Sequence, residues 1–210
     1  MDANVTAFVG VSALLIIVPG PDTAIVTKNA LLHGRRTALG TALGVNTGLL
    51  LWTVATAFGL AALVRASEVA FTALKVGGAL YLVWLGVQTL RDARRSPSGE
   101  PVQAPVPRKR LGGLGGFRQG VTSDLANPKI AVFFTSLLPQ FVAPGTPVLE
   151  PFLVLGCVFV AMGTIWLSGF ALVASRASSA LRRPRVKRAL DRLTGLVLIG
   201  LGLRLATERR

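Results

Sequence analysis

Cysteine, histidine and acidic residues are scarce in this chain. It has one cysteine (Cys157), one histidine (His33) and only 9 aspartate and glutamate residues. A single cysteine excludes a disulfide framework and the CxxC pairs of redox and thiolate metal sites. Because no cluster of histidine, cysteine and acidic residues occurs at ligand spacing, we expect neither a metal site nor a cofactor.

Charge of either sign is also low, and it is unevenly placed. Charged residues make up 15% of the chain, against about 25% in a typical soluble domain. The net charge of +14 lies in short basic runs between long apolar blocks. This pattern fits lipid headgroups and topology signals, and it argues against a nucleic-acid-binding face. The first residues lack the basic region of a signal peptide, so we expect the first apolar block to stay in the mature protein.

The apolar blocks are long enough to cross a membrane. A transmembrane helix needs roughly 20 apolar residues, and the mean hydropathy of the whole chain is +0.60. We therefore predict an all-α integral membrane protein with six transmembrane helices. The predicted segments are 5–32, 38–64, 69–90, 117–142, 152–174 and 190–206.

A proline-, glycine- and arginine-rich stretch divides these segments three and three. We predict a first three-helix repeat over 1–90, a basic cytoplasmic linker over 91–116 and a second three-helix repeat over 117–210. The loops after the first, third and fifth segments are basic, whereas the other two are nearly neutral. The positive-inside rule then places the linker in the cytoplasm and both termini outside.

Two segments, the first and the fourth, are interrupted by proline. Pro19, Gly20 and Pro21 break the first segment, and Pro128 breaks the fourth. Because three crossings precede the linker, the second half enters the membrane from the opposite side to the first. Broken segments at matching positions of two such halves indicate a transporter built as a 3+3 inverted repeat, with its site between the repeats.

Charged residues follow both breaks, at Asp22 and Lys129, and Asp124 precedes the second. A charge near the bilayer centre costs about 2.5–3.5 kcal/mol, so such residues favour a functional role. We predict a substrate or proton site in which Asp22 and Asp124 receive an ammonium group or a proton. The half-helix N-termini, one of them capped by Asn127, face an anion together with Lys129. Two alternatives stay open. The breaks can be plain helix restarts, or Asp22 and Lys129 can form an ion pair that never meets a substrate.

The second segment carries two further features. Asn46 shares a face with Thr53 and either bonds a neighbouring helix or lines the pathway. Another face carries Gly40, Gly44 and Gly48, and these small residues permit close helix contact within the chain or in a homodimer.

These motifs together resemble the LysE/RhtB family of amino-acid exporters. The resemblance is carried by PGPDT at 19–23, by 33–36 with the glycine run, by 73–86, by NPK and the residues after it at 127–141, and by 200–205. It implies a LysE-type translocator in the bacterial inner membrane that exports amino acids or close derivatives by proton antiport. Asparagine also occurs in the family at the position of Asp22, so this resemblance does not make Asp22 the sole proton carrier.

Other classes of function are weaker. Exporters of metal cations or other solutes share the architecture, but the chain lacks a ligand cluster for metals. An intramembrane enzyme could use Asp22 and Asp124 as a carboxylate pair, but no G-x-G-D, H-E-x-x-H or G-x-S-x-G motif occurs around them. A purely structural scaffold would leave the buried charges without a reason. We therefore expect no enzymatic activity.

Overall fold

The computed structural model describes residues 2–66, 68–95, 111–142, 149–176 and 184–207. The described residues are helical apart from short connections, and they include no strand, which confirms the all-α prediction. The helices are α1 (Asp2–Ile17), α2 (Pro21–His33), α3 (Arg35–Ala66), α4 (Glu68–Arg95), α5 (Gly113–Leu125), α6 (Pro128–Val132), α7 (Leu149–Arg176) and α9 (Pro184–Thr207). Between α6 and α7, a π-helical turn η1 (Phe133–Leu137) leads into a 3₁₀ turn η2 (Leu138–Phe141).

The predicted linker is partly helical at its ends. Helix α4 continues to Arg95 and α5 already begins at Gly113, so both helices extend into the 91–116 stretch. Residues 96–110, which form most of that stretch, lie outside the described residues. The division into domains therefore stays a prediction.

Two described helices are long and apolar enough to cross a membrane by themselves. They are the Arg35–Gly59 part of α3 and the whole of α7, Leu149–Arg176. Helices α1 and α2 form a third span if the pair, bent by 44°, is counted as one broken crossing. By length and composition, the described helices therefore show two or three membrane spans, and the six predicted crossings stay a prediction.

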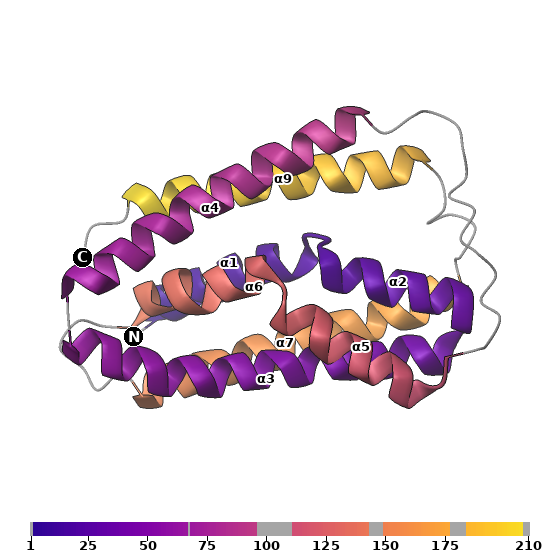
Figure 1. Cartoon of the computed structure of the whole chain (residues 1–210), viewed down its shortest axis with the longest axis horizontal. Helices are drawn as coiled ribbons and strands as arrows, with labels where there is room; N and C mark the ends of the chain where they lie inside the picture. Colours follow the sequence, from indigo (N-terminus) through magenta and orange to yellow (C-terminus); the bar gives the residue numbers. More distant parts are fainter. Residues whose placement is uncertain (1, 67, 96–110, 143–148, 177–183, 208–210) are drawn as a thin grey trace.

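The helices are arranged in layers (Figure 1). Helices α4 and α9 lie together along one edge, α3, α5 and α7 lie along the opposite edge, and α1, α2 and α6 lie between them. Helix α1 begins, and α9 ends, at the same end of the molecule, where α3 also turns into α4 (left in Figure 1). The turn from α2 into α3 and the start of α5 lie at the other end, so the basic segment ends gather there.

Glycine allows the close contact between α3 and α5. A Cβ atom built on Gly44 would lie 2.0 Å from the carbonyl oxygen of Phe117, and one on Gly40 would lie 2.3 Å from that of Gly113. Only glycine fits such a backbone approach. Of the two alternatives for this face, contact within the chain is therefore correct. The homodimer predicted through Gly40, Gly44 and Gly48 is incompatible with this packing, because α5 occupies the surface it would need.

Small residues also join the antiparallel pairs α3–α7 and α4–α9. Gly163 of α7 packs against Asn46 of α3, and Gly156 packs against Thr53, seven residues away on each helix. Gly86 of α4 meets Gly195 of α9 in the same manner. These glycine contacts bring the helix backbones together where lipid provides little hydrophobic drive for association.

An aromatic core fills the space between α1, η1 and α7. The rings of Phe133 and Phe159 stack with centroids 4.2 Å apart, and Phe8 meets Phe141 edge to face at 5.3 Å. The wider π-helical turn of η1 allows both Phe133 and Phe134 to be fully buried. This core closes the side of the molecule next to the site described below.

Candidate functional site

The first helix break leaves backbone carbonyl groups without helical donors. In an unbroken helix the carbonyl of Leu15 would accept from residue 19, but Pro19 has no N–H group. The helical bonding of α1 ends with the bond from Val18 N to Leu14 O, at 3.0 Å. Helix α2 then restarts at Pro21, with Gly20 in extended geometry at its N-cap. Carbonyls at the end of α1 are therefore free to take other donors.

Lys129 of α6 supplies a donor to this break. Its ammonium nitrogen lies 3.1 Å from the carbonyl oxygen of Leu15 and 3.1 Å from that of Val18. The side chain is 6% exposed and passes over Gly20, where a Cβ would lie 3.2 Å from the nitrogen. A third element joins the same break, since the Thr194 hydroxyl of α9 donates to the Pro19 carbonyl at 3.0 Å.

Asp22, in the first turn of α2, is bonded to the second break. Its carboxylate accepts from the Ser123 hydroxyl at 2.8 Å and from the Asn127 side-chain amide at 2.5 Å. The same Asn127 side chain accepts from the Lys129 backbone N–H at 3.1 Å and so caps α6. One asparagine therefore starts its own helix and holds the carboxylate of the other broken segment.

The second break is closed by its own backbone and by a tryptophan. Pro128 cannot donate to the Asp124 carbonyl as a helical residue would. That carbonyl accepts instead from the Asn127 N–H at 2.9 Å and from the Trp52 indole N–H at 3.4 Å. The break leaves the Asp124 side chain at the end of α5, facing α3.

The Asp124 carboxylate is buried without a hydrogen bond. Its exposed fraction is 0%, and within the described ranges neither of its oxygens has a partner. It lies against Gly48, where a Cβ would come within 2.4 Å of one carboxylate oxygen. The side-chain oxygen of Asn46, 5% exposed, also has no partner, while its amide donates to the Ala42 carbonyl at 2.8 Å. Two unpaired acceptors in one place are unusual, because a buried acceptor without a partner costs about 1–3 kcal/mol.

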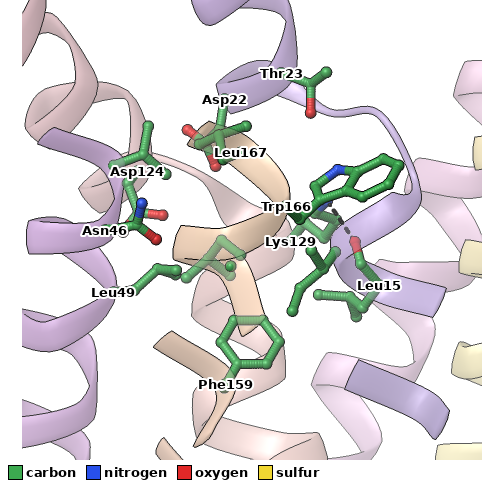
Figure 2. Close-up of a pocket in the computed structure, with 14 residues that line it drawn as sticks. Leu15, Asp22, Thr23, Asn46, Leu49, Asp124, Lys129, Phe159, Trp166 and Leu167 are labelled. Atoms are coloured by element: carbon green, nitrogen blue, oxygen red, sulfur yellow. Dashed lines mark hydrogen bonds between the residues drawn. The ribbon is translucent and has the colours of Figure 1, made fainter. Parts of the chain in front are cut away.

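These groups line one cavity between the two breaks. Figure 2 shows Asp124 and Asn46 at one side of it and Lys129 at the other, with Asp22 above and the Phe159 ring below. The cavity has a volume of about 40 Å³. A buried water needs roughly 10–15 Å³ on this scale, so a few waters fit but an amino acid does not. The remaining lining side chains are mostly apolar: Leu15, Ile16, Val45, Leu49, Ile130, Trp166 and Leu167.

The structure brings every predicted site residue to this place. Asp22, Asp124, Lys129 and Asn46 line the cavity, and Asn127 bonds Asp22 beside it. All four predicted break residues lie at the breaks: Pro19 and Gly20 between α1 and α2, Pro21 as the first residue of α2, and Pro128 as the first residue of α6. Their roles toward a substrate or proton stay predictions. Asp22 and Lys129 use different hydrogen-bond partners, so the observed hydrogen bonds do not pair them with each other.

Several contributors were missed from the sequence. Ser123 and Trp52 bond the break residues, and Trp166 and Phe159 line the cavity. Ser123 lies directly before Asp124 in the last turn of α5, and this position beside a predicted site residue was the signal available for it. In the described part of the chain, no three histidine, cysteine, aspartate or glutamate side chains gather as a metal site.

The sequence of this chain matches a known protein family over nearly its whole length. The model of the family described as LysE type translocator matches residues 13–209. The chain belongs to the LysE type translocator family. It is 34% identical over 210 residues to an uncharacterized membrane protein of Vibrio cholerae serotype O1, covering 100% of both chains. Membership of this family and the apolar helices make it a membrane protein.

Two relatives of this translocator carry functional names. A homoserine/homoserine lactone efflux protein of Salmonella typhi is 33% identical over 203 residues, which cover 97% of this chain and 96% of the relative. A threonine efflux protein of Escherichia coli (strain K12) is 30% identical over 203 residues, covering 95% of each chain. No solved structure matches the translocator significantly.

Proposed function

We propose that this chain exports amino acids or close derivatives across the bacterial cytoplasmic membrane. The names of its relatives support this proposal, since they are efflux proteins for homoserine, its lactone and threonine. The same names favour a transporter over an enzyme. The observation that carries the proposal is the cavity with unpaired acceptors on one side and an ammonium on the other.

The two sides of the cavity suit the two ends of an amino acid. The Asp124 carboxylate and the Asn46 oxygen offer acceptors for an ammonium group, which has three N–H donors. Lys129 gives two of its three hydrogens to backbone carbonyls, which leaves one for a carboxylate or an ester carbonyl. The ammonium is the group that an amino acid and its lactone share, so we assign the main recognition to Asp124 and Asn46.

The cavity must widen to admit a substrate, and on one side, beyond the Asp22–Ser123 bond, the helices are held by neutral hydrogen bonds. Asn29 of α2 donates to Thr41 of α3 at 2.8 Å and to Gln119 of α5 at 3.0 Å. Nearer the linker, His33 Nδ1 accepts from the Leu111 N–H at 3.1 Å. Each such bond contributes only about 0.5–1.5 kcal/mol net, whereas the other side is closed by the aromatic core. Separation of α2 from α5 is therefore the proposed cytoplasmic entry.

The internal packing supports a 3+3 inverted repeat with six crossings. If 1–90 and 117–210 are the repeats, α3 and α7 correspond and pack antiparallel, as do α4 and α9. Helix α2 is likewise antiparallel to α5, with Asp22 near Ser123 and Asn29 near Gln119. The two broken segments then meet at the centre, where inverted-repeat transporters place their sites. The basic segment ends at one end of the molecule favour a cytoplasmic linker and external termini.

Proton antiport is the proposed energy source. Two carboxylates line the cavity, so one can receive a proton when the substrate ammonium leaves. Asp124 is the better candidate, because the Asp22 oxygens already accept from Ser123 and Asn127. In this scheme proton and ammonium compete for one carboxylate, which couples their opposite movements.

Expression in a strain sensitive to amino-acid analogues tests the proposal. We expect resistance to toxic analogues of small amino acids, with lowered intracellular pools of the corresponding natural amino acid. An uncoupler that removes the proton gradient should abolish the difference. No change for any member of a broad panel, with the protein confirmed in the membrane, would refute amino-acid export.

A further inference from the structure

We propose that the end of α1 is a binding site for a small monovalent cation, which Lys129 fills with its own ammonium. The site consists of the carbonyl oxygens of Leu15 and Val18, both 3.1 Å from the Lys129 nitrogen. Lys129 is thus a tethered cation, and the wild-type protein needs no sodium or potassium ion at this place.

The break creates the site from backbone atoms. Pro19 lacks the N–H group that would bond the Leu15 carbonyl in a continuous helix. The extended backbone at Gly20 interrupts the helix between Val18 and Asp22, so the Val18 carbonyl also loses its helical donor. Carbonyls at a helix C-terminus also carry the negative end of the helix dipole, which favours a cation. Exposed carbonyls at the C-terminal ends of broken helices coordinate sodium ions in several transporter folds. The chemistry of the site is therefore that of an alkali-cation site.

The surroundings of Lys129 show that the ammonium is held there by the carbonyls. The side chain is buried at 6% exposure and its two hydrogen bonds go to backbone oxygens rather than to a carboxylate. Gly20 provides the room, because a Cβ there would come within 3.2 Å of the nitrogen. Asp22 and Asp124 line the same cavity and add negative charge around the cation.

A short, neutral side chain at position 129 should make the protein depend on an added cation. In Lys129→Ala the carbonyls and the two carboxylates remain, but the positive charge is gone. Sodium, ammonium or methylammonium ions are small enough to approach the carbonyls through the space of the removed side chain. This inference concerns the cation site itself; only its transport test rests on the proposed function.

Thermal unfolding of the purified protein in detergent is the first test. Samples contain about 0.1 M sodium, ammonium, methylammonium or choline chloride at equal ionic strength, a concentration at which surface charges are screened equally. We expect Lys129→Ala to unfold several degrees higher with at least one small cation than with choline. The wild type and the control variant Lys28→Ala, which removes an exposed lysine of α2, should show no difference.

Transport in proteoliposomes is the second test. The transport rate of Lys129→Ala should be at least five-fold higher with the same cation than with choline. The transport rate of the wild type should be equal in both. The two tests can give different answers. If a small cation stabilises Lys129→Ala but the wild type transports no amino acid, the cation site is supported and the proposed function is refuted. No stabilisation of Lys129→Ala by any of the cations would overturn the inference.

Two further measurements keep the inference testable if Lys129→Ala does not fold. Lys129→Ser can replace Lys129→Ala, since its hydroxyl offers the cation one more oxygen. The wild type is informative by itself, because a rise in its unfolding temperature or transport with sodium over choline would contradict a site already filled by Lys129.

Discussion

The side-chain amide of Asn127 donates a 2.5 Å hydrogen bond to the carboxylate of Asp22 across a sequence separation of 105 residues. Asn127 starts the second half of one broken segment, and Asp22 lies in the first turn after the break of the other. The bond therefore fixes the two breaks relative to each other. Movement of either half-helix during transport must keep this bond or exchange it for another.

An Asn127→Asp substitution should destabilise the protein strongly. It places two carboxylates in contact and removes the amide donor, and a buried bond to a charged group contributes about 1.5–3 kcal/mol. We expect a fall of several degrees in the unfolding temperature. The double variant Asp22→Asn/Asn127→Asp restores one amide and one carboxylate and should recover most of the loss. Equal instability of the single and double variants would show that the pair does not interact as described.

Gly48→Ala should disturb the Asp124 side chain directly. The added methyl would lie 2.4 Å from a carboxylate oxygen, so the carboxylate must move. We expect at least a ten-fold loss of transport together with a lower unfolding temperature. Gly59→Ala on the same helix is the matched control, because nothing lies within 4 Å of its added methyl. Similar effects from both variants would mean that a general response of α3, rather than contact with Asp124, is measured.

Asn46→Leu should weaken substrate binding with little effect on the fold. The substitution replaces the amide by an apolar side chain of similar size. It removes an oxygen without a partner among the described residues and one local bond to the Ala42 carbonyl. We expect the KM for the exported amino acid to rise several-fold, with a smaller change in kcat. Thr53→Val is the control, since Thr53 shares the same face of α3 and does not line the cavity. An unchanged KM in Asn46→Leu would remove Asn46 from the site.

The orientation in the membrane is testable with single cysteines. In a Cys157→Ser background, Thr207→Cys places a thiol at the exposed end of α9, and Arg36→Cys places one at the exposed start of α3. We expect a membrane-impermeant maleimide to label the first variant in intact spheroplasts and the second only after lysis. The reverse pattern would invert the topology derived from the positive-inside rule.

The proline breaks and the charged residues beside them were predictable from sequence because their causes are local. Pro19 and Pro128 end helical bonding wherever they lie, and charges beside them in apolar segments are expensive unless they face protein. Such reasoning selected Asp22, Asp124, Asn127 and Lys129, which the fold brings together.

Features set by long-range packing were not predictable in the same way. The Gly40, Gly44 and Gly48 face was compatible with a dimer or an internal contact, and only the position of α5 decides between them. The use of backbone carbonyls by Lys129 depends on where α6 meets the end of α1. The buried pair Phe133 and Phe134 depends on a π-helical turn that no single residue specifies.

Transport by Asp124→Asn tests the account most directly, because Asp124 is the buried carboxylate without a partner among the described residues. The amide keeps the shape and removes the charge, so we predict an unfolding temperature equal to or above that of the wild type. Uptake of labelled amino acid into proteoliposomes with an imposed proton gradient should fall to the level of empty vesicles. Glu150→Gln, an exposed acidic residue of α7, should transport like the wild type. Full transport by a folded Asp124→Asn protein would contradict the assignment of the site.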